Sequence, residues 1–193
     1  MRGSFRQPKH HAHHEHHAAP SAGEPHTVNS SPAPLGTVAS LHLHPAQPGT
    51  PLSAVQSIEL VEAKGIVGDT RYFGRLSGST GQPTRRQVSL IEREQIAEHS
   101  RALGLGGIPP GAVRSNIETT GVNLLTLLGH EIQIGSAVLR VHSPRDPCAK
   151  MDAICQGLRE RMMGQRQGVL AEVVGSGTIR AGDSIRVRVR EPS

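Results

Sequence analysis

The sequence has almost no aromatic residues. It contains no Trp, one Tyr and two Phe among 193 residues, so the core of a folded domain must be aliphatic. Proteins that bind single-stranded nucleic acid stack the bases on aromatic side chains, and this chain offers few of them. The formal charge of +5 therefore favours a small anionic ligand, and we expect no nucleic-acid partner.

Cysteines and long apolar runs are also scarce. The two cysteines, Cys148 and Cys155, fit neither a secreted disulfide framework nor the Cys-x2-Cys spacing of zinc sites, which favours a reducing compartment. No apolar segment approaches the roughly 20 residues of a membrane-spanning helix, and no early apolar segment resembles a signal peptide. We expect a soluble cytoplasmic protein that does not bind membranes, with a mitochondrial location left open.

Glycine, proline and histidine are plentiful. The 22 Gly and 14 Pro are typical of a strand-rich fold with many turns. Residues 1–34 are rich in His and Pro and have too few large apolar side chains to fold. Both natural low complexity and an expression tag fit this tail, which we expect to be disordered. The folded domain is predicted to span residues 35–190.

Alternating apolar residues predict strands through most of this domain. Thr37, Ala39, Leu41 and Leu43 lie on one face of the first expected strand. Further elements are predicted at 55–61 (strand), 72–84 (a Gly/Ser loop that could act as a flap), 86–91 (strand), 92–103 (helix), 113–117 (strand), 131–141 (hairpin), 151–162 (helix) and 168–189 (closing strands).

The segment that draws most attention is Ser143 to Lys150, which holds Cys148 directly after a proline. Arg145 and Lys150 can stabilise a thiolate by Coulomb attraction, and a thiolate attacks electrophiles or binds a soft metal. The alternative is a small buried apolar residue, the usual environment of a free cysteine. Cys155 shares an apolar helical face with Met151 and Leu158, and we assign it to core packing.

Two other groups of polar residues are candidates for a site. Asp69 and Arg71 follow Gly68 at the end of an expected strand, although an ordinary Gly-Asp turn would give the same pattern. Arg114 and Asn116 alternate in the short expected strand 113–117, so both side chains should point to one face. That pair could bind an anion, and two solvated side chains would look the same in sequence.

The motifs together resemble the MOSC family, the domain found at the C-terminal end of molybdenum cofactor sulfurases and also alone. Order and spacing agree over residues 35–189. The motifs that carry the resemblance are Lys64-Gly65-Ile66-Val67-Gly68-Asp69, Arg86-Gln87-Val88-Ser89-Leu90-Ile91, Pro110-Gly111 with Arg114-Ser115-Asn116, Gly135, and Pro144-Arg145-Asp146-Pro147-Cys148.

The resemblance implies a mostly β (α+β) fold, a barrel with a few short helices. It also implies that Cys148 is the catalytic residue and either ligates molybdenum in a bound pterin cofactor, molybdopterin, or carries sulfur as a persulfide. Some similar stand-alone bacterial members help to reduce N-hydroxylated compounds. The expected cofactor-binding residues are Asp69, Arg71, Arg86, Arg114, Asn116, Arg145 and Lys150.

The chain departs from the family pattern in two ways. Ser115 stands where the family often has Glu, which lowers the negative charge there. No pyridoxal-phosphate site of a cysteine desulfurase precedes the expected domain, so sulfur would come from a donor such as a separate desulfurase.

Three hypotheses for function remain. The first is a molybdenum-cofactor protein, a component of a molybdenum-dependent oxidoreductase that acts on a small-molecule substrate. With no flavin motif or iron–sulfur cysteine set in the sequence, its electrons would come from an electron-transfer protein. The second is a sulfur carrier or sulfur transferase that holds a persulfide on Cys148 for metal–sulfur cofactor assembly. The third is a binding module with a structural cysteine.

Overall fold

The computed structural model describes residues 32–189. The predicted tail lies outside these residues except for its last positions, 32–34, and Arg190 at the other end of the predicted domain lies outside them as well.

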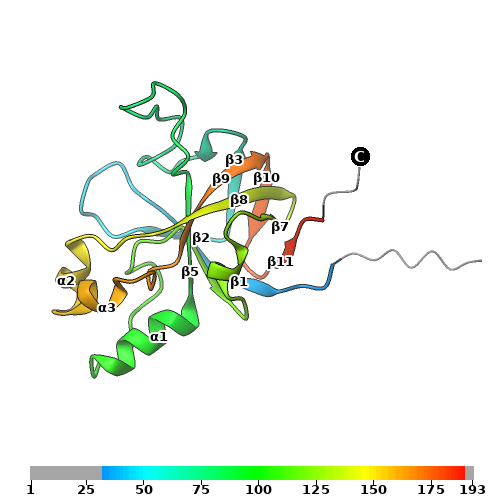
Figure 1. Cartoon of the computed structure of the whole chain (residues 1–193). Helices are drawn as coiled ribbons and strands as arrows, with labels where there is room; N and C mark the ends of the chain where they lie inside the picture. The colour runs from blue at the N-terminus through cyan, green and yellow to red at the C-terminus, as the bar shows by residue number, and fades with distance from the viewer. Residues whose placement is uncertain (1–31, 190–193) are drawn as a thin grey trace, which may run out of the picture. The chain divides into compact units, whose positions relative to one another are not determined.

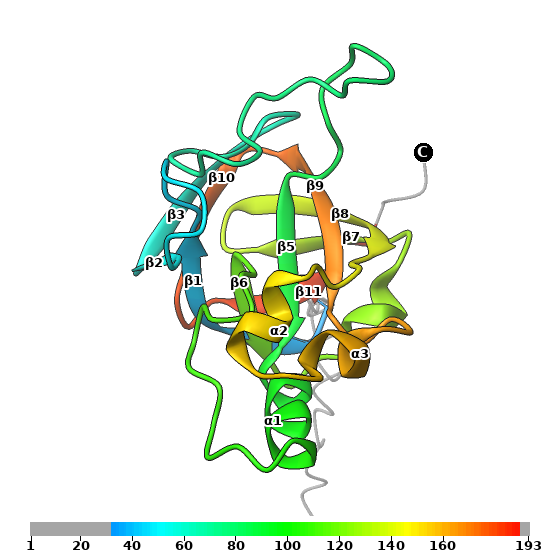
Figure 2. The ribbon, with the colours of Figure 1, turned by 90° about the vertical axis from the view of Figure 1, so that its left-hand side faces the viewer.

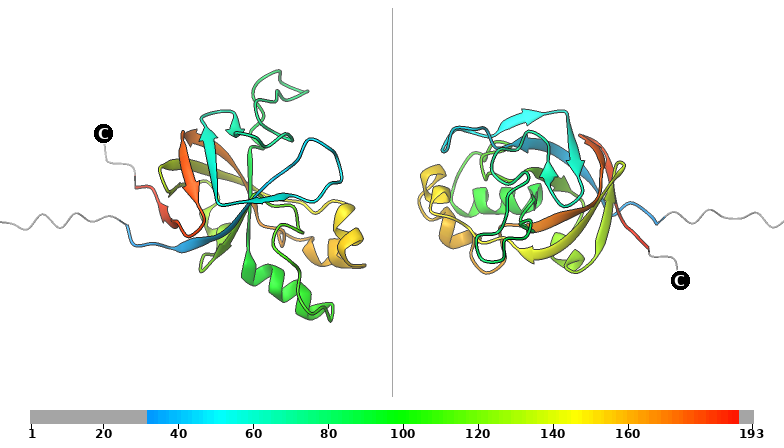
Figure 3. Two further views of the ribbon diagram at one scale, coloured as in Figure 1. Left: turned by 180° about the vertical axis from the view of Figure 1, so that it is seen from behind. Right: turned by 90° about the horizontal axis from the view of Figure 1, so that it is seen from above.

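A closed barrel of seven strands forms the body of the domain. It closes because β1 pairs with β6 on one side and with β11 on the other, and Figure 3 shows the ring of strands from above. The order around the barrel is β1 (Gly36–Leu43), β11 (Ser184–Val187), β7 (Glu131–Ile134), β8 (Ala137–Pro144), β9 (Val169–Gly175), β5 (Val88–Glu92) and β6 (Ile117–Thr120).

Four further strands complete the β structure of the described residues. β2 (Ser53–Val55) pairs with the end of β1. A separate three-stranded sheet contains β10 (Gly177–Arg180), β3 (Ser57–Val61) and β4 (Gly65–Ile66). The single strand predicted at 55–61 is thus two strands in different sheets, divided at Gln56.

The interior of the barrel is aliphatic, as the composition predicts. Leu41, Leu90 and Leu139 are fully buried and belong to one large cluster that runs through the barrel. Burial of apolar side chains contributes roughly 25 cal/mol for each Å² removed from water, so this cluster is the main source of stability.

Three short helices gather on one side of the barrel (Figures 1 and 2). They are α1 (Arg93–Ala102), α2 (Lys150–Ile154) and α3 (Leu158–Met162). The 3-10 turn η1 (Leu124–Leu127) packs Leu124 and Leu127 into the barrel cluster instead. Ile96, Met151 and Leu158 pack in a second, smaller apolar cluster beneath these helices. The helices therefore have their own core beside the barrel.

The predicted helix at 151–162 is wrong in its continuity. It is divided into α2 and α3, because Cys155 is extended and Gly157 has a φ of 89°. The apolar periodicity is satisfied by both pieces, which is why the sequence did not reveal the break. Cys155 is half-buried and packs against the smaller cluster, as expected of a packing residue.

The prediction that Thr37, Ala39, Leu41 and Leu43 share one face of the first strand is also wrong. The pairing of β1 with β6 shifts register between Val38 and Ser40, which is a β-bulge. The extra residue reverses the alternation, so Val38 and Leu41 are buried while Thr37 is exposed.

β5 and β6 are parallel neighbours, and α1 connects them. Parallel strands begin at the same end of a sheet, so Arg86 before β5 and the segment 111–116 before β6 lie together. The end of β1 lies there too, because β1 runs antiparallel to β6. This topology places the candidate site.

Replacement of Gly168 by Ala tests the close approach of β9 to β5. Gly168 has a φ of 74°, and an added Cβ would press against the backbone carbonyl of Leu90. We expect the free energy of unfolding to fall by about 3 kcal/mol or more, from left-handed strain plus overpacking. Urea denaturation measures it.

Gly164→Ala is the matched control. Gly164 has a φ of 71° and open space around it, so this variant should lose only about 1 kcal/mol. Equal losses in both variants would contradict the close approach.

Candidate functional site

A pocket of about 390 Å³ lies where these strand ends meet, and its wall is strongly cationic. Arg71, Arg86, Arg114 and Lys150 were predicted as site residues and all four line it; Arg75 adds a fifth cation that the sequence did not point to. None of the described residues in its lining is Asp or Glu. The remaining lining residues are His44, Pro45, Ala46, Gln47, Pro48, Thr70 and Tyr72.

Asp69 is buried behind this wall rather than in it. Its Oδ2 accepts hydrogen bonds from the backbone N and Nδ1 of His44 and from Asn116 Nδ2, and its Oδ1 accepts one from the backbone N of Arg71. Burial raises the pKa of the Asp69 carboxyl, but these hydrogen bonds outweigh burial and hold the pKa below its usual value. Asp69 therefore holds His44 and Arg71 in place as an ionised carboxylate.

Asn116 occupies the centre of the same buried network. Its Oδ1 accepts hydrogen bonds from the backbone N and Oγ of Ser89, and its Nδ2 donates to the His42 carbonyl (3.1 Å) and to Asp69 (2.8 Å). Asn116 thus joins the end of β1, the start of β5 and the turn at Asp69. It does not line the pocket.

The predicted strand at 113–117 is wrong, because β6 begins only at Ile117. Arg114 has a φ of 65°, a left-handed conformation that no strand contains. Arg114 and Asn116 consequently do not share a face: Arg114 lines the pocket and Asn116 is fully buried.

His44 was not predicted from the sequence, because its role depends on two segments that meet only in the fold. Its Nδ1 lies 2.8 Å from Asp69 Oδ2. An ionised carboxylate can only accept, so Nδ1 carries the proton and Nε2 is the nitrogen that Asp69 does not engage. The His44 ring meets Tyr72 edge to face, with centroids 6.1 Å apart. His44 can hold or transfer a proton at Nε2 on the pocket wall.

Arg145 supports the wall from behind, and its guanidinium donates hydrogen bonds to neutral groups. It donates to the carbonyls of Val113 (3.3 Å) and Arg114 (3.1 Å) and to Ser115 Oγ (2.8 Å). Burial lowers the pKa of Arg145 to about 10; nearby Tyr72 and Cys148 act in the opposite direction, and Arg71 and Arg86 lower it further. The group remains charged at neutral pH.

Cys148 is exposed on the loop between β8 and α2. It is not among the residues that line the cationic pocket, but Lys150 on the same loop is. The loop is attached at both ends: the Arg145 N donates to the Gly168 carbonyl (2.9 Å), and the Cys148 carbonyl accepts from the Met151 N (3.1 Å). The structure therefore holds an accessible thiol beside the cationic wall.

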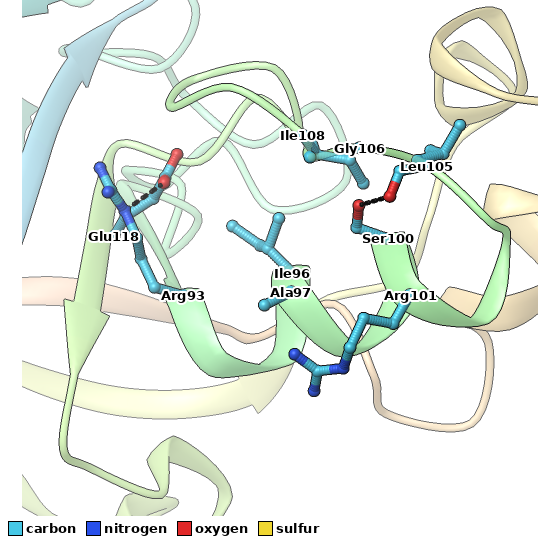
Figure 4. Close-up of a pocket in the computed structure, with 10 residues that line it drawn as sticks. Arg93, Ile96, Ala97, Ser100, Arg101, Leu105, Gly106, Ile108 and Glu118 are labelled. Carbon is cyan, nitrogen blue, oxygen red and sulfur yellow. Dashed lines mark hydrogen bonds and ion pairs between the residues drawn. The ribbon is translucent and has the colours of Figure 1, made fainter.

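A second pocket, of about 290 Å³, lies beside α1 and contains none of the predicted site residues (Figure 4). Its Arg93 is paired with the buried carboxylate of Glu118 at 3.1 Å, as the dashed line in Figure 4 marks. Because this carboxylate offsets a cation within the pocket, the pocket lacks the uniform charge of the first one.

Residues 32–189 lack two further features. No group of three or more His, Cys, Asp or Glu is arranged to hold a metal ion there. Within the same residues, no helix combines the length and apolar character that crossing a membrane requires.

Stability should depend on pH through Asp69. A carboxyl whose pKa is lower in the folded than in the unfolded chain stabilises the fold above its ordinary pKa of about 3.9, and this contribution is lost as pH falls through the folded value. We expect the free energy of unfolding to fall on acidification below about pH 4, and to fall less in Asp69→Asn, which is already less stable at neutral pH. Urea denaturation at several pH values measures both.

Asp146→Asn is the control, because Asp146 is an exposed acid on the neighbouring loop. It should retain the wild-type dependence on pH. If Asp69→Asn also retained it, the network would not depend on an ionised Asp69.

Comparison with solved structures shows the same fold in three bacterial proteins. The YuaD protein from Bacillus subtilis is 23% identical, with a TM-score of 0.67, over 81% of this chain and 97% of the other. YiiM from Geobacillus stearothermophilus is 17% identical, with a TM-score of 0.60, over 80% and 76%. YiiM from Escherichia coli is 18% identical, with a TM-score of 0.58, over 83% and 73%.

Comparison with curated proteins found no match. The model of the MOSC domain family, however, matches residues 26–186, which include the whole of the candidate site and all of the barrel strands except the last residue of β11. The protein therefore belongs to the MOSC domain family.

Proposed function

We propose that the protein binds the molybdenum cofactor, with Cys148 as the protein ligand to molybdenum, and reduces N-hydroxylated small molecules with electrons from a separate electron-transfer protein. The observation that carries this proposal is the cationic pocket, with its five Arg and Lys side chains, beside the exposed Cys148 loop. Membership of the MOSC domain family supports it.

The residues present fit the chemistry of that cofactor. A phosphate group carries up to two negative charges and is bound well by guanidinium groups, which donate in a fixed fork. Arg71, Arg86 and Arg114 offer three such groups from three segments of the chain. Lys150, two residues after Cys148 in the sequence, adds a further positive charge.

The exposed thiol fits the metal. A thiolate is a soft ligand that suits molybdenum in a pterin cofactor, which brings further sulfur ligands of its own. One protein ligand then suffices, and Cys148 is the exposed cysteine of the described residues. When bound, the cofactor would supply two-electron redox chemistry.

Protons would come from this chain. Reduction of an N-hydroxylamine to an amine consumes two electrons and two protons and releases water. His44 lines the pocket and is oriented by Asp69 through Nδ1. We assign proton transfer to its Nε2.

A second candidate function is sulfur carriage, and the exposure of Cys148 favours it. A persulfide carrier must present its sulfur to a donor, such as a cysteine desulfurase, and then to an acceptor. Arg145 and Lys150 would stabilise the anionic persulfide in the same way as a thiolate.

Anion binding can be measured without the cofactor. Titration calorimetry of the purified protein with inorganic pyrophosphate should show one site. Arg86→Gln and Lys150→Gln should each weaken it by about tenfold, because a charged hydrogen bond of this kind is lost.

Arg180→Gln is the matched control, because Arg180 is an exposed arginine on β10 outside the pocket lining. It should leave the affinity unchanged. A uniform weakening in all three variants would indicate a response to overall charge and contradict a defined pocket.

The role of Cys148 can be tested by metal content. The protein is produced in cells that synthesise the cofactor, and molybdenum is measured by elemental analysis and X-ray absorption. We expect wild type and Cys155→Ser to hold molybdenum and Cys148→Ser to lose it or to show one sulfur ligand fewer. Metal-free wild type with a cyanide-labile persulfide that is absent in Cys148→Ser would favour the sulfur carrier instead.

A further inference from the structure

An apolar pocket of about 550 Å³ adjoins the cationic one. Its wall comes from the loop before β2, the loop before β6, and α2. Nine of its eleven lining residues carry no charge and no polar side chain: Gly49, Pro51, Leu52, Pro109, Pro110, Gly111, Ala112, Ala153 and Ile154. The volume and character are those of a site for the body of a small organic ligand.

The two pockets meet at Arg114 and Lys150, which line both of them. Arg114 is fixed at this boundary, because its Nη1 donates to the Thr50 carbonyl at 3.1 Å and its own carbonyl accepts from Arg145. A ligand in the apolar pocket would therefore reach the cationic pocket with one end only.

The apolar wall is held in a defined shape. Pro109 and Pro110 restrict the backbone of one side. The backbone N of Gly111 donates to the buried carboxylate of Glu118 at 2.6 Å, and the Ala112 N donates to the Pro109 carbonyl. A preformed wall of this kind binds without a large ordering cost.

We propose that this pocket binds the uncharged, apolar body of the substrate and directs its polar reactive group past Arg114 and Lys150. This inference rests on the proposed function, in which the anionic cofactor occupies the cationic pocket. An apolar body gains little from binding in the cationic pocket. In the apolar pocket it can bury its surface against Leu52, Ala153 and Ile154. A lining without carboxylates offers nothing to a cationic body.

The test uses the cofactor-free protein and two fluorescent probes. N-phenyl-1-naphthylamine is apolar and uncharged, and 1-anilinonaphthalene-8-sulfonate adds a sulfonate to a similar body. We expect both to bind. Saturating inorganic phosphate should leave the affinity for the neutral probe unchanged, and it should weaken the sulfonate probe, whose charged end reaches Arg114 and Lys150.

Two variants on opposite walls locate the probes. Ala153→Glu and Leu52→Glu should each reduce the affinity for the neutral probe by about tenfold or more, because a charge is placed against an apolar ligand. Both should leave pyrophosphate binding measurable, which shows that they are folded. Ala102→Glu, at an exposed alanine of α1, should change neither.

Each other outcome is informative. Unchanged affinity for the neutral probe in both wall variants would overturn the proposal, and so would displacement of that probe by phosphate. Absence of molybdenum in the loaded protein would refute the proposed cofactor but would leave the probe results as they stand, so the two failures can be told apart.

Discussion

The candidate site depends on one buried network, in which Asn116 and the carboxylate of Asp69 share a hydrogen bond of 2.8 Å. Through these two side chains the end of β1, the start of β5 and the turn after β4 are fixed to one another. Buried polar groups are costly when they lack a partner and rigid when all are satisfied. The network therefore fixes the end of the barrel next to the pocket, as the aliphatic cluster fixes its middle. The cationic side chains of the pocket extend from segments next to this rigid network.

The positive charge of the site is left largely uncompensated. The Arg145 guanidinium donates hydrogen bonds to two backbone carbonyls and to Ser115 Oγ, all of which are neutral groups. Two buried acids behind the site already have partners, Asp69 with His44 and Glu118 with Arg93. Positive charge is consequently directed toward a ligand instead of being neutralised within the protein.

Sequence reasoning succeeded where local pattern determines structure. The alternation of apolar and polar residues predicted the hairpin of β7 and β8. The order of the motifs predicted the barrel fold and the membership of the chain in the MOSC family. It failed where structure depends on distant contacts. The left-handed backbone at Arg114 placed Asn116 in the interior, and no pattern in residues 113–117 indicates that turn. His44 and Arg75 reach the pocket only because the barrel closes and brings separate loops together, so neither had a signal in sequence.

The crowding of like charges has a thermodynamic consequence for the domain itself. Arg71, Arg75, Arg86, Arg114 and Lys150 repel one another across a single pocket, and this repulsion opposes folding in the absence of an anion. An anion that binds only the folded chain relieves the repulsion and shifts the folding equilibrium by mass action. A bound anion would in this sense supply the counter-charge of the pocket, and the anion concentration of the solution would shift the fraction of the protein that is folded.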